Sequence, residues 1–201
     1  EAMRNNSTGS GIVAVGHATL RANTASNNTA VGMTALNANT SGIRNVAVGG
    51  GSYGFTVGAL GKNTTGSFNT ALGDQALLNN TTASNNTAIG AGSLITNTTG
   101  TTNVALGKDA LYSNTTASSN TAVGYQALYS STTSSENVAV GYQALYSQTT
   151  ASTGQNTAVG HRAGVSTNGY YNSLFGYKAG ESSSGYRNAF IGHAAGIDMT
   201  S

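Results

Sequence analysis

The chain has 201 residues, of which only 7% are charged, and it contains no cysteine, proline or tryptophan. The lack of cysteine excludes disulfide bonds and thiolate metal sites. The net charge of +2 and the scattered basic residues give no electrostatic footprint for nucleic acid. No apolar run approaches the length needed to cross a membrane.

From about residue 11 onward, the chain repeats one motif: Asn, a small or β-branched residue, Ala, an aliphatic residue and Gly. Residues 120–124, NTAVG, are a clear copy. A run of about five residues with two-residue alternation, closed by glycine, predicts a short strand. Thr121 and Val123 should lie on one face of that strand and Ala122 on the other. A second apolar pair, Ala-Leu, follows at 127–128, and a Ser/Thr-rich turn completes the unit.

The motif recurs about every 16–17 residues, which indicates one structural rung stacked on copies of itself. Taking the final glycine as the register mark, we expect rungs at Gly16, Gly32, Gly49, Gly58, Gly73, Gly90, Gly107, Gly124, Gly141, Gly160, Gly176 and Gly192. The repeat therefore predicts an all-β protein, a parallel β-roll or β-solenoid of about twelve rungs. No change of composition divides it, so we expect a single domain over 1–201.

Two places interrupt the spacing, and the last rungs change the motif. The step from Gly49 to Gly58 is only nine residues, and the turn over 148–155 gains two residues. Regular rungs are expected over 11–159. From Gly160 onward the Ala-Leu pair becomes Ala-Gly, so we expect 160–196 to form variant end rungs that lose the buried leucine and gain aromatic residues nearby.

A single slender coil has little apolar surface to bury. Each rung offers roughly two or three aliphatic side chains, which at ~25 cal/mol per Å² barely offset the backbone entropy of the rung. The alanine face of the strands is small, apolar and continuous, and packing it about a symmetry axis would stabilise the rod. We therefore expect a trimer interface at Ala30, Ala47, Ala71, Ala88, Ala105, Ala122, Ala139 and Ala158.

The units NTAVG, NVAVG and NTAIG, each followed by an Ala-Leu pair, resemble the repeats of two families. They are similar to the head repeats of trimeric autotransporter adhesins, and more closely to the NTAVGYQAL repeats of bacteriophage and other viral tail-fibre proteins. The resemblance covers about residues 11–196. It implies a left-handed parallel β-roll, a homotrimer, and an extracellular location on a virion tail fibre or a cell surface.

Catalytic and metal-binding motifs find little support. Residues 49–54, GGGSYG, match a dinucleotide-binding pattern and a nucleophile elbow, but both need a helix to follow, and a strand pattern follows instead. His17, His161 and His193 lie on distant rungs, whereas a metal site needs ligands brought together. The carboxylates show no paired spacing for acid–base chemistry. We predict a non-enzymatic protein without a cofactor or a metal.

Paired threonines such as Thr98 and Thr99 recur in successive turns. A regular threonine column could bind ice, but adjacent residues of an extended chain face opposite ways, so only one threonine per rung can point outward. Ice binding is therefore a remote alternative. N-glycosylation sequons share this edge, at Asn63, Asn80, Asn97 and Asn114, so sugars would decorate it in a source that glycosylates asparagine.

Aromatic residues on a rigid sheet suit sugar faces and protein anchors, because they offer a large contact area at low entropy cost. The regular columns Tyr112, Tyr129, Tyr146 and Tyr125, Tyr142 are one rung apart, close enough to stack, and are expected to pack between chains. The irregular C-terminal rungs are the better place for recognition. We predict ligand binding at Tyr170, Tyr171, Tyr177 and Tyr186.

Two functions follow from these features. The first is a receptor-binding fibre or adhesin head that attaches to a glycan or protein of a host or cell surface. The second is a purely structural shaft or filament protein, whose repeats only set length and rigidity. Neither involves nucleic acid or membrane insertion.

Overall fold

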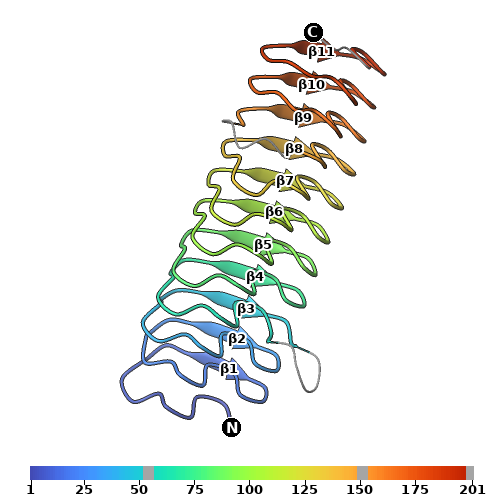
Figure 1. The fold of residues 1–201 in the computed structure, drawn as a ribbon. Coiled ribbons are helices and arrows are strands. Elements are labelled where there is room, and N and C mark those ends of the chain that lie inside the picture. The colour runs from blue at the N-terminus through green and yellow to red at the C-terminus, as the bar shows by residue number, and fades with distance from the viewer. Residues whose placement is uncertain (52–56, 149–153, 198–201) are drawn as a thin grey trace.

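The computed structural model describes residues 1–51, 57–148 and 154–197, and over these residues the chain is a parallel β-solenoid. Eleven short strands stack in chain order into one sheet, and the first and last strands lie at opposite ends of the rod (Figure 1). The strands are β1 (Val13–Val15), β2 (Thr29–Val31), β3 (Val46–Val48), β4 (Thr70–Leu72), β5 (Thr87–Ile89), β6 (Val104–Leu106), β7 (Thr121–Val123), β8 (Val138–Val140), β9 (Thr157–Val159), β10 (Ser173–Phe175) and β11 (Ala189–Ile191). In the described ranges, no helix is long and apolar enough to cross a membrane.

Neighbouring strands pair in parallel and in register, so equivalent positions of successive rungs lie side by side. Ala122, for example, is flanked by Ala105 and Ala139. The pairing continues through the turns, where the Leu128 N–H donates to the Ala144 carbonyl at 3.0 Å. Each rung supplies backbone partners to its neighbours, which explains the absence of proline. The predicted all-β parallel solenoid is confirmed.

The prediction of a separate rung at Gly58 was wrong. The Ala59 N–H donates to the carbonyl of Gly49 at 3.1 Å, and Ala59 and Leu60 are buried in the position that the Ala-Leu pair occupies in other rungs. Gly49 and Gly58 therefore belong to one long rung that starts at β3, since nine residues cannot complete a circuit. Most of the GGGSYG motif, residues 52–56, lies outside the described residues.

The core of the rod is formed by two facing columns of side chains. The middle residue of each strand points inward, and the leucine of the Ala-Leu pair meets it from the turn. The leucine column has no exposed surface and comprises Leu20, Leu36, Leu60, Leu77, Leu94, Leu111, Leu128 and Leu145. Leucine fills most of the thin interior, so only alanine fits opposite it.

This arrangement overturns the predicted interface. The eight alanines Ala30, Ala47, Ala71, Ala88, Ala105, Ala122, Ala139 and Ala158 each have 0% exposed surface in a single chain, so their side chains cannot contact another chain. The first and third residues of each strand point outward instead. The homotrimer itself stays a prediction, and the surface it would use must be a different one.

The variant end rungs exchange large and small residues across the core. Leu174 and Phe190 take the strand position that alanine holds elsewhere, and Gly164, Gly180 and Gly196 take the turn position of leucine. A Cβ on Gly180 would lie 2.8 Å from Leu174 Cδ2. The last rungs therefore do lose the leucine of the turn, as expected, but Leu174 restores a fully buried leucine from the strand side.

Two buried asparagine ladders hold the rungs in register. The first ladder stands just before the strands, where the Oδ1 of each asparagine accepts the backbone N–H of the next at 2.9–3.1 Å. It runs without interruption through Asn28, Asn45, Asn69, Asn86, Asn103, Asn120, Asn137, Asn156, Asn172 and Asn188.

The second ladder lies in the turns, where each Nδ2 donates to the Oδ1 of the preceding rung at 2.6–3.1 Å, through Asn23, Asn39, Asn63, Asn80, Asn97 and Asn114. This ladder corrects the view of the sequons as a site for sugars. Their four asparagines have 0% exposed surface and are hydrogen-bonded inside the coil.

Candidate functional site

Three groups of aromatic side chains decorate the C-terminal half of the rod. In the first group, Tyr112, Tyr129 and Tyr146 stack at centroid distances of 5.0 and 5.1 Å. Their rings are half-buried, and burial raises the pKa of the Tyr129 hydroxyl above its usual range, with the neighbouring Tyr112 and Tyr146 adding to the effect. The predicted stacking of this column is confirmed.

The second group, which we name the ring ladder, consists of Tyr125, Tyr142, His161, Tyr177 and His193. Successive rings are 4.9–5.5 Å apart and nearly parallel, with interplanar angles of 12–16°. Because each inner ring has its faces covered by its neighbours, it presents mainly its edge to solvent. The ring ladder is therefore poorly suited to packing against the face of a sugar, although it is exposed.

The third group, which we name the C-terminal cluster, consists of Tyr170, Tyr171, Tyr186 and Arg187. The ring of Tyr170 stacks on that of Tyr186 at a centroid distance of 5.3 Å. It meets the ring of Tyr171 edge-on, at a centroid distance of 5.2 Å and an interplanar angle of 71°. The guanidinium of Arg187 lies over the ring of Tyr171, 5.8 Å from its centroid. The structure thus brings together three of the four tyrosines predicted to bind a ligand.

Tyr177, the fourth predicted residue, lies elsewhere. It is part of the ring ladder, stacked between His161 and His193. It follows the strand-ending Gly176, whereas the tyrosines of the cluster precede the strands, so the two groups occupy different positions on the rung.

The first asparagine ladder fixes the backbone under the C-terminal cluster. Tyr171 and Arg187 both have φ of 62°, a left-handed conformation that is uncommon for such side chains. Each directly precedes a ladder asparagine, whose backbone N–H donates to the preceding rung at 2.9 Å. The sequence could not show the contribution of Arg187, which became evident only from its position over the ring of Tyr171.

An exposed apolar surface runs along the outer face of the sheet. We name it the apolar strip, and it consists of the third residue of every strand: Val15, Val31, Val48, Leu72, Ile89, Leu106, Val123, Val140, Val159, Phe175 and Ile191. All are aliphatic or aromatic, and all are exposed or half-buried. Ten rung spacings of ~4.8 Å give the strip a length of ~48 Å. It therefore extends along the whole sheet without a charged residue.

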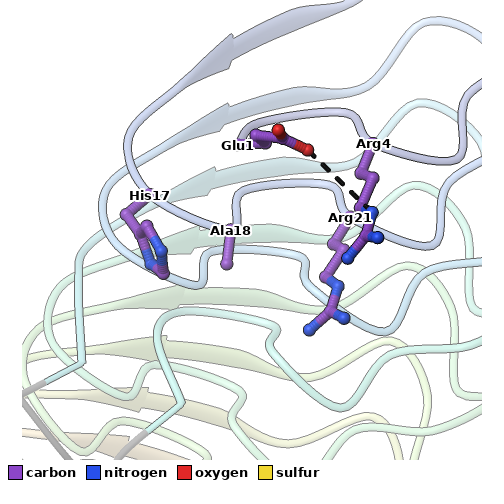
Figure 2. Close-up of a pocket in the computed structure, with 5 residues that line it drawn as sticks. All are labelled: Glu1, Arg4, His17, Ala18 and Arg21. Atoms are coloured by element: carbon purple, nitrogen blue, oxygen red, sulfur yellow. Dashed lines mark ion pairs between the residues drawn. The ribbon is translucent and has the colours of Figure 1, made fainter.

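A polar pocket of about 310 Å³ lies at the N-terminal end. Figure 2 shows its lining residues, with Glu1 beside Arg4, and Arg21 on the neighbouring rung. The Arg4 Nε–Glu1 Oε2 distance is 3.9 Å, and both side chains are largely exposed, so this pair contributes little. The pocket opens above the small side chain of Ala18, a position that carries glutamine in several later rungs.

The histidines and carboxylates lie apart from one another. His17 lines the N-terminal pocket, while His161 and His193 belong to the ring ladder. Within the described ranges, no group of three or more His, Asp or Glu side chains is placed to hold a metal ion. Glu181 accepts from both Arg162 and Lys178, at 2.8 and 3.1 Å, and so serves as the counterion of two cations.

The threonine pairs divide into an inner and an outer column. In four of the pairs the first hydroxyl donates to the backbone of the next rung, as Thr98 Oγ1 does to the Thr115 carbonyl at 3.0 Å. The pair at 149–150 lies outside the described residues. The second threonine, such as Thr99, is exposed. Because the first column is hydrogen-bonded within the coil, only the second column has free hydroxyls. A flat ice-binding face would need two such columns.

Comparison of the chain with protein-family models, curated proteins and solved structures finds no match.

Proposed function

We propose that this chain is part of an extracellular fibre or an adhesin head, on a virion tail fibre or a cell surface, that attaches to a host or cell-surface receptor without catalysing a reaction. The observation that carries the proposal is the apolar strip, which lies along the entire length of a narrow, rigid rod. A surface of this kind favours side-by-side assembly of rods into a fibre. The repeats of the tail-fibre and adhesin families, which the sequence resembles, support the same reading.

The partner of the apolar strip is a second copy of the chain, in a homotrimer. The strip is ~48 Å long and has side chains every ~4.8 Å. A partner must match both its length and its period to bury it continuously, and another copy of the same solenoid does so. Leu106 is 43% exposed and Ile191 is 77% exposed in one chain, which leaves apolar surface to bury.

The C-terminal cluster is the proposed receptor site. Its rings are held on a backbone fixed by the asparagine ladder, so little conformational entropy is lost on binding. The cluster lies before the strands, whereas the apolar strip occupies their outer face. A receptor could therefore reach the cluster while the strips pack together.

A glycan and receptor array tests the proposal with two double variants. Tyr170→Ala with Tyr171→Asn should abolish specific binding, and asparagine at position 171 tolerates the left-handed backbone. The matched control, Tyr129→Ala with Tyr146→Ala, removes stacked rings from another column and should keep binding. If the control loses binding and the first variant keeps it, the receptor site lies on the side of the rod. If the unmutated chain binds nothing specifically, it is a structural shaft.

A further inference from the structure

We infer that the C-terminal cluster recognises an acidic saccharide, in which a sugar ring packs on a tyrosine face and a carboxylate pairs with Arg187. This inference rests on the proposed receptor role of the same cluster and names the class of its ligand.

The rings of the C-terminal cluster offer open faces, which the ring ladder does not. Tyr186 uses one face to stack on Tyr170, and 59% of the residue is exposed. Tyr171 stands nearly perpendicular to Tyr170 and is 44% exposed. Two flat, differently oriented aromatic surfaces therefore adjoin Tyr170, and Arg187 lies over one face of Tyr171. A sugar ring has an apolar C–H face that packs on such a surface and a hydroxyl edge that remains in water.

Arg187 adds a positive charge that the described part of the chain does not neutralise. Its guanidinium lies over the Tyr171 ring, and no described carboxylate forms an ion pair with it. The cations Arg162 and Lys178, by contrast, share Glu181. A guanidinium can hold a carboxylate through two parallel hydrogen bonds, and stacking on a ring restricts its orientation. The unpaired charge beside open rings therefore favours a sugar that carries a carboxylate.

The surface fits a saccharide better than a peptide. A peptide gains affinity by inserting anchor side chains into pockets, and the polar pocket lined by Glu1 and Arg4 lies on the N-terminal rungs, away from the cluster. The C-terminal cluster offers exposed ring faces and one cation on a turn of the coil. Peptide binding is accordingly an alternative outcome of the test below.

The chain supplies a matched control among the residues that directly precede the asparagines of the first ladder, nearer the N-terminus. Arg44 also precedes a ladder asparagine, has φ of 55°, and lies over the ring of Phe68 at 5.3 Å. It differs from Arg187 in having one aromatic partner without a second, perpendicular ring. Removing either arginine changes the net charge equally, so a difference between the two variants reports the site and not the overall charge.

Isothermal titration of the full chain with sialyllactose and with lactose tests the inference. The unmutated chain should bind the acidic sugar about tenfold more tightly, as expected for a charge-assisted bidentate contact. Arg187→Asn should abolish this difference, and asparagine suits the left-handed backbone. Arg44→Asn should change neither affinity by more than about twofold, because Arg44 is exposed and lies many rungs from the C-terminal cluster, where its charge is screened by salt. Tyr186→Ala should weaken both sugars, with circular dichroism confirming the fold of each variant.

Several results would overturn the inference. These are equal affinity for the two sugars, equal losses in Arg187→Asn and Arg44→Asn, or tighter binding of an acidic peptide than of sialyllactose. If neither sugar binds while the array gives hits that need Tyr170 and Tyr171, the acidic-sugar inference fails and the receptor role stands. If the array gives no hits, the proposed receptor role fails as well.

Discussion

The two halves of the rod keep the same strand register with different side chains. From β1 to β6, a second asparagine ladder inside the turns connects each rung to the next. From β7 onward this ladder is interrupted, and stacked rings appear on the outside, at Tyr125, Tyr142 and their neighbours. The inner amides are buried and leave the surface free, whereas the outer rings change the surface itself. Recognition is therefore expected in the half where aromatic side chains reach solvent.

The core side chains also differ between the regular rungs and the end rungs. Regular rungs pair a strand alanine with a turn leucine, and the end rungs pair Leu174 or Phe190 with a turn glycine. In these two rungs the summed volume is similar to that of a regular rung. The rung of β9 instead pairs Ala158 with Gly164, and Leu174 of the next rung extends towards Gly164. In the rungs of β10 and β11, the fold therefore keeps the volume across the rung and not the residue at one position.

The largest effect is expected from charging the core of the regular half. Ala105→Glu would bury a carboxylate beside apolar neighbours, which should cost at least about 4 kcal/mol and unfold the chain at ordinary temperature. Leu106→Glu, on the same strand but facing outward, should leave each chain folded and disperse the trimer. Circular dichroism and light scattering distinguish the two outcomes.

Light scattering of the unmutated chain should give a mass near three times 20.0 kDa. A stable monomer would contradict the trimer and remove the role proposed for the apolar strip. A folded, associated Ala105→Glu variant would contradict the inward orientation of the alanine column.

A smaller effect is expected from exchanging the core patterns of the two halves. Leu174→Ala should cost about 2–5 kcal/mol, since Gly164 and Gly180 provide no side chain to fill the space. Gly180→Leu alone should cost about 1–3 kcal/mol, because its Cβ would crowd Leu174. The double variant recreates a regular alanine–leucine rung and should recover at least half of the summed loss. Thermal and urea unfolding measure the coupling energy between the two substitutions. Strictly additive losses would show that the strand and turn residues do not compensate for one another in volume.

Much of the fold could be predicted from the sequence because the motif repeats with little change. The two-residue alternation and the closing glycine located every observed strand, and asparagine precedes each of them except β1, which follows Ile12. The alternation also placed Ala122 opposite Thr121 and Val123 correctly. It could not tell which face was inside, since large aliphatic side chains normally point inward. Leu128 indicates which face is inside. Because a thin coil cannot accommodate large side chains from both walls, the strand must turn its alanine towards the leucine.

The candidate site was only partly predictable. Column spacing along the chain correctly placed Tyr125 beside Tyr142, since equivalent positions are one rung apart. The grouping of Tyr177 with the C-terminal cluster failed because proximity in sequence is not proximity on a rung of 16 residues. The sequons misled in a similar way. A sequon usually marks the surface, but the buried face of this turn also requires asparagine, as at Asn97.

The smallest effect is expected where the second asparagine ladder ends. Asn114 is its last member, and Ser131 and Gln148 take the next two positions. The Asn114 Oδ1, the Ser131 Oγ and both polar atoms of the Gln148 side chain are buried without a hydrogen-bond partner among the described residues. Buried polar atoms that lack partners cost free energy. The serine is too short to reach the asparagine, which interrupts the chain of amides.

Ser131→Asn should extend the ladder by one rung. Its Nδ2 could donate to the Asn114 Oδ1, and its Oδ1 could accept from Gln148. Satisfying these groups should raise the free energy of unfolding by about 1 kcal/mol, which a thermal melt of protein made in a host without N-glycosylation would detect. Thr116→Asn, on the exposed face of the preceding rung, is the matched control and should shift stability by less than about 0.5 kcal/mol. A lower melting temperature for Ser131→Asn alone would mean that the space beside Ser131 is already filled, because a well-packed interior does not admit the larger amide.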